Sequence, residues 1–170
     1  MSWNEGVKGE GGVVAWGWFT THHQVSLRES ILGELILPAL GRGGVFCYAD
    51  GRELEMEKTS WWKGWHELRE NGIVVGSARP LGFWGQRISV GYRGRMYELA
   101  TAGFWGDRWH LVDESGTVLV EIWRRGFFRQ KVAMTVHLEV QPDLLVFVYY
   151  LAHARWQEQA AAVGGAAAGS

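Results

Sequence analysis

Near its C-terminus the chain reads Leu144-Leu145-Val146-Phe147-Val148-Tyr149-Tyr150-Leu151-Ala152-His153-Ala154. Wound as an α-helix, this run has no polar stripe, and a helix that is apolar on every side belongs in an interior. At about 1.5 Å per residue the helix would reach only ~17 Å, which is too short to cross a bilayer. Pro142-Asp143 just before it is a favourable helix start, because Pro needs no N–H donor there and Asp suits the positive end of the helix dipole. The run therefore predicts a buried helix with the rest of the chain folded around it.

The composition limits the class of protein. The 170 residues are 47% hydrophobic and 21% charged, and they include 24 Gly and 11 Trp. These values exclude a disordered chain and favour many short strands joined by Gly-containing turns. A chain of this length is expected to form one domain. We place that domain at residues 13–157, between a flexible Gly-rich arm at residues 1–12 and a flexible Ala-rich tail at residues 158–170.

Cysteine usage and the N-terminal residues predict the compartment. The single cysteine, Cys47, cannot form an internal disulfide, which makes a reducing cytoplasm the expected location. The N-terminus lacks the basic start and apolar run of a secretory signal. We therefore expect a cytoplasmic protein, free or peripherally bound to a membrane, with no transmembrane segment. Within Val45-Phe46-Cys47-Tyr48 the thiol is expected to be a buried apolar side chain rather than a nucleophile.

The middle of the chain repeats itself. Two Trp-His pairs, Trp65-His66 and Trp109-His110, lie 44 residues apart. The aromatic segment Gly82-Phe83-Trp84 returns at the same spacing as Gly126-Phe127-Phe128, whereas Gly-Arg at 51–52 returns after 43 residues at 94–95. One residue has therefore been gained or lost between the two copies. Repetition at this length indicates a duplicated supersecondary unit.

Each copy predicts four strands. Asn71-Gly72 and Ser115-Gly116 are typical of two-residue hairpin turns, because Gly and Asn tolerate positive φ. Alternation places Val118, Val120 and Ile122 on one inward face. The corresponding positions in the first copy are Val74, Gly76 and Ala78. These smaller side chains would leave room for the helix. The eight strands are expected at residues 52–57, 65–69, 73–79, 86–92, 96–101, 108–113, 117–124 and 131–136. Upstream, apolar segments predict strands at 13–19 and 45–48 and two short pieces within 25–37, around Gly33.

A family resemblance follows from these features. Its residues are the apolar C-terminal run and the segments 97–99, 109–118, 122–124 and 140–143, within about residues 30–156. The pattern resembles the tubby-like superfamily, which includes tubby C-terminal domains, phospholipid scramblases and plant LURP-one-related proteins. The resemblance implies an all-β fold with one central helix: a closed antiparallel barrel of about 12 strands with an internal two-fold repeat, threaded by the hydrophobic C-terminal α-helix.

The chain departs from the functional motifs of that superfamily. Scramblases have an acidic calcium loop near the final helix, whereas Gln141-Pro142-Asp143 offers one carboxylate, and calcium takes six or more oxygen ligands. The phosphoinositide motif of animal tubby domains has no counterpart here. Neither activity is therefore expected of this chain.

Two equivalent hairpin loops form the candidate binding site. Residues 79–87 and 124–131 both place aromatic side chains at a tip flanked by cations, and residues 79–131 hold nine Lys or Arg against five Asp or Glu. Aromatic tips insert at a lipid interface, and each cation adds about 1 kcal/mol near an anionic surface. The alternative is that the aromatic side chains fold inward and plug the barrel ends. The candidate residues are Arg79, Phe83, Trp84, Arg87, Arg124, Arg125, Phe127, Phe128, Arg129 and Lys131.

The histidines do not form a metal-binding pattern. His22 and His23 are adjacent and would point to opposite faces of a strand, while His66 and His110 occupy equivalent positions in separate copies. His153, within the apolar run, is expected to be a core histidine. We therefore expect no metal ion and no cofactor.

These observations favour a protein that binds rather than catalyses. No Ser stands in a G-x-S-x-G motif, and no Gly-rich loop is followed by the Lys-Ser/Thr of a phosphate-binding loop. We expect a non-enzymatic module that docks on an anionic membrane or on another protein through the aromatic-basic hairpins. The alternative is a carrier of a small apolar ligand, such as a lipid, in the barrel or in a surface groove. Nucleic acid is not an expected partner, because the formal net charge is −1.

Overall fold

Twelve strands and one helix make up the part of the chain that the structure describes. The computed structural model describes residues 6–17, 20–38, 43–60, 62–82, 86–102, 106–125 and 131–167. The elements are β1 (Val7–Trp16), β2 (Thr20–Leu27), β3 (Ser30–Pro38), β4 (Gly43–Tyr48), β5 (Glu53–Ser60), β6 (Trp65–Glu70), β7 (Ile73–Leu81), β8 (Arg87–Tyr92), β9 (Arg95–Ala102), β10 (Arg108–Asp113), β11 (Val118–Arg125), β12 (Lys131–Val140) and α1 (Pro142–Ala167).

The strands form one closed antiparallel barrel. Each strand pairs with its neighbours in the chain, and β1 closes the barrel by pairing with β12. The predicted fold class, a closed 12-stranded antiparallel barrel with a C-terminal helix, is confirmed. Closure gives every strand a partner on both sides, so the sheet has no free edge.

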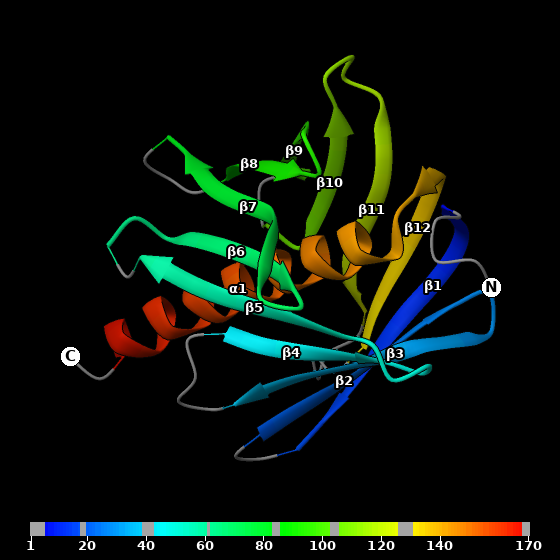
Figure 1. Ribbon diagram of the computed structural model, residues 1–170. Coiled ribbons are helices and arrows are strands. Elements are labelled where there is room, and N and C mark those ends of the chain that lie inside the picture. Colours follow the sequence, from blue (N-terminus) through cyan, green and yellow to red (C-terminus); the bar gives the residue numbers. More distant parts are fainter. Residues whose placement is uncertain are drawn as a thin grey trace.

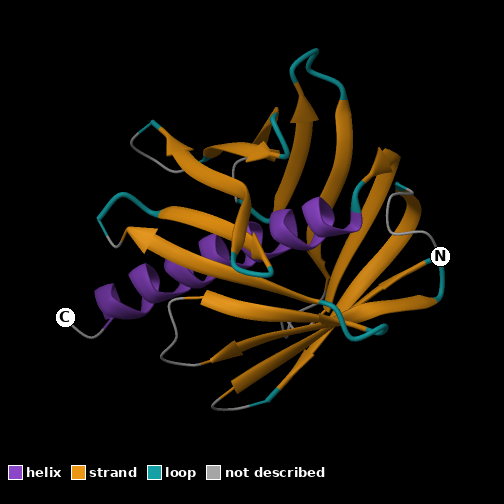
Figure 2. Cartoon of the chain, viewed as in Figure 1, coloured by secondary structure: helices purple, strands orange, loops and turns teal. Residues whose placement is uncertain are grey.

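Helix α1 runs through the barrel, enclosed by the strands (Figures 1 and 2). Nine consecutive residues, Leu144 to Ala152, are each at most 5% exposed. They pack against inward side chains that come from strands all around the barrel, including Leu35, Phe46, Leu99 and Leu111. The apolar run therefore forms the centre of the core, as its lack of a polar face predicts.

The two ends of the barrel are distinguished by where α1 begins and where it emerges. The proximal end is where α1 begins, beside Val140 at the end of β12. The distal end is where α1 emerges, and its C-terminal part, red in Figure 1, extends beyond the strands. Because neighbouring strands are antiparallel, the connections β1–β2, β3–β4, β5–β6, β7–β8, β9–β10 and β11–β12 all lie at the distal end. Both predicted aromatic-basic hairpins therefore belong to the same end of the barrel.

A buried carboxylate anchors α1 at the proximal end. Asp143, only 6% exposed, accepts hydrogen bonds from the hydroxyls of Tyr48 (2.5 Å) and Tyr92 (3.3 Å). Its oxygens also lie 3.6 Å from an Arg52 guanidinium nitrogen and 3.5 Å from one of Arg93. Burial and the neighbouring carboxylate raise the pKa of Tyr92 to about 12, so this hydroxyl keeps its proton and remains a donor. The helix start is thus joined to the β4–β5 and β8–β9 turns.

Substitution Asp143→Asn is expected to lower the free energy of unfolding by about 3 kcal/mol, because the hydroxyls of Tyr48 and Tyr92 lose the buried anion that accepts their hydrogen bonds. Urea unfolding followed by circular dichroism measures this change. Asp50→Asn is the matched control, because Asp50 also faces Arg52, at 3.6 Å, but on the surface, where an ion pair contributes at most about 1 kcal/mol. Equal losses from the two substitutions would contradict the anchoring role.

Three predicted boundaries are wrong. Residues 7–12 are not a flexible arm but the first half of β1, where the glycines permit close strand pairing: a Cβ on Gly11 would lie 2.4 Å from the Ser26 carbonyl oxygen. The two pieces within 25–37 divide at a turn, Arg28-Glu29, where φ is 48° and 65°, and Gly33 lies inside β3. Residues 158–167 are not a flexible tail but continue α1, since alanine is the strongest helix former.

The duplication is visible in the strands, but its spacing changes within the repeat. His66 and Leu68 of β6 point inward, and the inward residues of β10 are Trp109 and Leu111, 43 positions later. The partner strands keep the spacing of 44, because Leu68 pairs with Gly76 and Leu111 with Val120. The extra residue therefore lies in the β10–β11 connection. The prediction that His66 and His110 are equivalent is wrong, since matching Trp-His pairs face opposite sides.

That extra residue also changes the turn. Instead of a two-residue turn at Ser115-Gly116, four residues, 114–117, connect β10 and β11. The Asp113 carboxylate accepts hydrogen bonds from the backbone N–H groups of Ser115 and Thr117, both at 2.9 Å. The predicted turn at Asn71-Gly72 is confirmed, with φ of 51° and 76°.

One inward position is also wrong. Val74 is exposed, whereas Gly76 and Ala78 are buried as predicted. The pairing of β6 with β7 skips one residue between Leu68–Gly76 and Arg69–Val74. This bulge turns Val74 to the outer face.

Candidate functional site

Ion pairs and ring contacts place the predicted cations in different surroundings at the distal end. Arg79 is exposed, and its guanidinium lies 4.6 Å from the centre of the Trp65 ring. Arg87 binds Glu98 with two hydrogen bonds, at 2.7 and 2.6 Å. Arg125 and Lys131 are a pair of exposed residues opposite each other in the β11–β12 ladder.

Arg124 alone among the described candidates faces the helix. Its side chain is 15% exposed and forms an ion pair with Asp107. The guanidinium carbon lies 5.1 Å from the centre of the Trp156 ring on α1. Arg124 therefore contributes to the space around the emerging helix and not to the outer surface of the hairpin.

The aromatic tips lie outside the described residues. Phe83, Trp84, Phe127 and Phe128, together with Arg129, fall within 83–85 and 126–130. Whether these side chains point outward or plug the barrel stays a prediction.

Sequence reasoning missed the aromatic side chain that is most exposed at this end among the described residues. Trp62, in the β5–β6 connection, is 93% exposed. The next residue, Lys63, is also exposed, and its ammonium lies 4.6 Å from the Trp65 ring. The run of two tryptophans and a lysine at 61–63 was the available signal, because large apolar residues in a connection have no strand face to bury them.

Outer-face aromatic residues next to cations recur in the two copies. Arg79 on β7 lies over Trp65 on β6, while Arg108 on β10 pairs in the ladder with Trp123 on β11 and lies 5.5 Å from its ring. The same contact is thus built with the two residue types exchanged between strands. Arg125 also lies 5.9 Å from the Trp123 ring. These contacts hold cations at the distal end without neutralising them.

Five exposed cations at the distal end are left without a carboxylate. Within the described part of the chain, no Asp or Glu oxygen lies within 4.0 Å of Lys63, Arg79, Arg108, Arg125 or Lys131. The acidic side chains at this end already have partners, since Glu98 pairs with Arg87, Asp107 with Arg124 and Glu158 with Lys58. The exposed charge that remains is positive.

Two cavities lie beside α1 where it leaves the barrel. One, of about 210 Å³, is bordered by β1, β2, β11 and β12, and the other, of about 370 Å³, by β2 to β6. They share Thr21, His153 and Gln157. Because α1 fills the barrel axis, a carried ligand would have to occupy such spaces beside the helix.

Buried histidines line these cavities. His23 is hydrogen-bonded through Nδ1 to the Tyr149 hydroxyl at 2.6 Å, and His66 likewise to the Tyr150 hydroxyl at 3.2 Å. Burial lowers the pKa of His23 to about 3, and burial followed by the Lys58 charge lowers that of His66 to about 4. Burial and then Arg124 lower the pKa of His153 to about 4. All three rings are neutral at pH 7.

The structure also shows the surroundings of the adjacent histidines and of the cysteine that the sequence analysis considered. His22 and His23 face opposite sides of β2 as predicted, with His22 paired to Glu34. Cys47 is half-buried rather than buried, and burial followed by Glu53 raises its thiol pKa, which disfavours a reactive thiolate. Among the described residues, no three His, Cys, Asp or Glu side chains gather closely enough to hold a metal ion.

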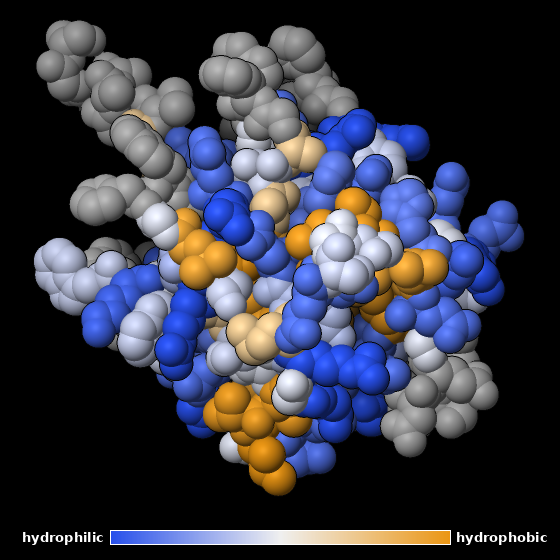
Figure 3. Space-filling model, turned by 90° about the horizontal axis from the view of Figure 1, so that it is seen from above, coloured by the Kyte–Doolittle hydropathy of each residue, from blue (hydrophilic) through white to orange (hydrophobic). Residues whose placement is uncertain are grey.

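Figure 3 shows one face of the molecule, where hydrophilic residues surround a few separate hydrophobic patches. Over the described residues, no helix combines the length and the apolar character that spanning a bilayer requires.

The chain matches no family model, no curated protein and no solved structure. The resemblance to the tubby-like superfamily therefore stays a prediction.

Proposed function

We propose that the protein is a non-enzymatic docking module that binds an anionic membrane surface with the distal end of its barrel. The observation that supports this most is the combination at one end of five exposed, carboxylate-free cations with the exposed ring of Trp62. Cations attract anionic headgroups, and Trp is favoured at the boundary between headgroups and acyl chains. The proximal end differs in charge, because Arg52 and Arg93 are paired there with Glu70. Its exposed Arg28 and Arg95 share that surface with exposed carboxylates, those of Glu29, Glu114 and Glu139.

The sequence of the distal connections supports the same proposal. Five of the six carry two adjacent aromatic residues, at 18–19, 61–62, 83–84, 104–105 and 127–128. The connections at the proximal end carry polar turns such as Asn71-Gly72 and Arg93-Gly94. An aromatic end opposite a polar end suits a protein that meets a membrane in one orientation.

Sedimentation with vesicles tests this function. We expect the protein to pellet with vesicles that contain phosphatidylserine, to remain in the supernatant with phosphatidylcholine alone, and to be released by high salt, because the attraction to headgroups is screened. Equal pelleting with both compositions would contradict the role of the cations. No pelleting with either would contradict membrane docking and direct the search to protein partners.

Substitution Trp62→Ala is expected to weaken binding to the anionic vesicles about tenfold, because an inserted Trp ring contributes a large apolar area. The melting temperature should stay within a few degrees of that of the parent protein, since an exposed side chain has few contacts to lose. Ile73→Ala is the matched control, because Ile73 is 69% exposed but lies at the proximal end. Equal losses of vesicle binding would show that either end can insert.

A further inference from the structure

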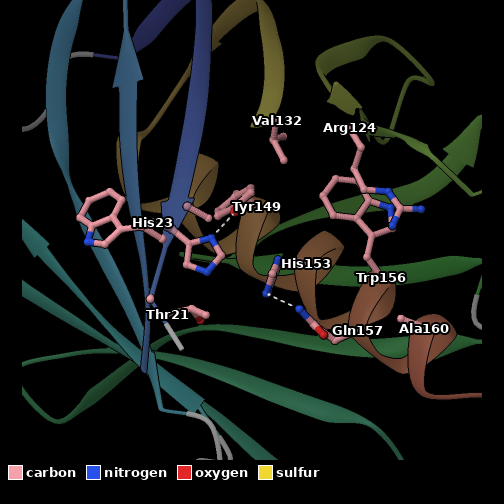
Figure 4. Close-up of a pocket in the computed structure, with 12 residues that line it drawn as sticks. Thr21, His23, Arg124, Val132, Tyr149, His153, Trp156, Gln157 and Ala160 are labelled. Atoms are coloured by element: carbon pink, nitrogen blue, oxygen red, sulfur yellow. Dashed lines mark hydrogen bonds between the residues drawn. The ribbon is translucent and has the colours of Figure 1, made fainter. Parts of the chain in front are cut away.

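The smaller distal cavity has one wall from the helix and one from the barrel. Figure 4 shows His23 and Thr21 on one side, Arg124 and Trp156 on the other, and His153 on the helix between them. Apolar surface comes from Ala15, Val132 and the Trp156 ring, whose N–H is already donated to the Gly106 carbonyl at 2.8 Å. Polar side chains, those of Thr21, His23, Arg124, Tyr149, His153 and Gln157, share the lining with this apolar surface, and His23 and Arg124 lie at opposite sides of it.

One of these polar groups is buried and has no partner. His23 is 2% exposed, and within the described residues its Nε2 makes no hydrogen bond. In Figure 4 the ring directs one nitrogen to Tyr149 and the other into the space between Thr21 and His153. Because the Tyr149 hydroxyl has no other hydrogen-bond partner in the described part of the chain, it is best satisfied as the donor to Nδ1, which leaves the proton of the neutral ring on Nε2. His23 therefore presents an unused N–H donor to the cavity.

The opposite side of the cavity carries a positive charge. The Arg124 guanidinium is mostly buried, and its ion-pair partner Asp107 has a side chain that is 61% exposed. An exposed carboxylate is well hydrated by itself, so a second anion within the cavity can share or replace it on Arg124. The two sides together offer a cation and a neutral N–H donor.

The size of the space limits the occupant. At about 210 Å³ it is somewhat larger than the cavity of about 150 Å³ that holds a single benzene molecule. A phospholipid does not fit, whereas a ring or a short chain with one polar group does. We propose that this cavity binds a small monocarboxylate whose carboxylate meets Arg124, whose apolar body, about the size of a benzene ring, lies against Trp156 and Val132, and whose opposite end reaches the side of His23. This inference does not depend on vesicle binding.

Titration with benzoate, followed by the ring resonances of the histidines in NMR spectra, tests the proposal. Benzoate is expected to shift the His23 resonances in a saturable manner, whereas benzyl alcohol, which has the same ring but no charge, should bind at least about tenfold more weakly. Equal binding of the two probes would overturn the role of Arg124. Absence of saturation with benzoate and with hexanoate, as expected if the cavity holds solvent alone, would overturn the proposal.

Two variants and a matched control assign the effect to this cavity. Arg124→Gln is expected to weaken benzoate binding about tenfold by removing the charge, whereas His23→Phe, which changes only the opposite side of the cavity, is expected to weaken it less. His66→Phe is the control, because it removes the equivalent histidine, hydrogen-bonded to Tyr150, from the other cavity. If His23→Phe does not fold, Arg124→Gln and the His23 shifts of the parent protein decide the question. A loss of binding in His66→Phe, with none in Arg124→Gln, would place the site elsewhere.

Discussion

A chain that ends at Gln141 is expected to lose cooperative unfolding altogether. The truncation removes α1, and with it nine consecutive residues that are each at most 5% exposed. Burial of a large apolar side chain contributes about 1.5 to 3 kcal/mol, so the sum exceeds the net stability of about 5 to 15 kcal/mol of a typical domain. The strands would also be left around an empty axis, with the inward side chains of the barrel exposed to water. Thermal unfolding followed by circular dichroism measures the loss.

The matched control is a chain that ends at Ala162. It keeps residues 157–162 of α1, whose side chains are exposed outside the barrel, and lacks only the residues after them. We expect its free energy of unfolding to stay within about 0.5 kcal/mol of that of the full chain. If the chain that ends at Gln141 still unfolds cooperatively with native strand content, the barrel does not need its helix and the account of the core is wrong.

Acid is expected to destabilise the protein strongly, starting near pH 6.5. The folded protein lowers the pKa of His23 to about 3 and of His66 to about 4, whereas in the unfolded chain both titrate near 6.5. Below pH 6.5 the unfolded chain therefore binds protons that the folded protein cannot. The stability that the neutral rings contribute is fully present above pH 6.5 and is lost as the pH falls towards 4 to 3. Each ring should account for about 2 kcal/mol between pH 7.5 and pH 5.

Urea unfolding at these two pH values measures the effect. The double variant His23→Gln with His66→Gln is expected to lose less stability between pH 7.5 and pH 5 than the parent protein, by about 4 kcal/mol, whatever its stability at pH 7.5. Thr21→Val changes the lining of the same two cavities without removing a titrating group, so its pH dependence should match that of the parent protein. An unchanged pH dependence in the double variant would contradict the assignment of neutral buried rings.

Much of the fold could be predicted because two features of the sequence act locally. An apolar run with no polar face has to be enclosed, and Asn71-Gly72 fixes a hairpin through its positive φ angles. Each strand also keeps its own alternation of inward and outward residues. What could not be predicted depends on the neighbouring strand. The close approach of the Ser26 carbonyl at Gly11 and the bulge opposite Val74 are properties of pairing, which single-strand patterns do not contain.

The site was predicted less fully than the fold, for a related reason. The exposed cations Arg79, Arg125 and Lys131 belong to the hairpins that the repeat singled out, but Arg124 is directed to Trp156, a contact between β11 and α1. Lys63 and Arg108 join the distal cations only because the topology gathers six connections at one end. The unpartnered nitrogen of His23 is likewise a consequence of packing against Tyr149, 126 residues later in the chain.

The central claim is that the distal end, and not the proximal end, meets the membrane. Hydrogen–deuterium exchange of the intact protein, with and without phosphatidylserine vesicles, tests it most directly. Strand β6 suits this test, because it begins at the distal end of the barrel and finishes at the proximal end. We expect vesicles to slow exchange in peptides that contain Trp62 and Lys63, before β6, and to leave peptides that contain Asn71 and Gly72, after β6, unchanged. Slower exchange at Asn71 and Gly72 with no change at Trp62 and Lys63 would contradict the account.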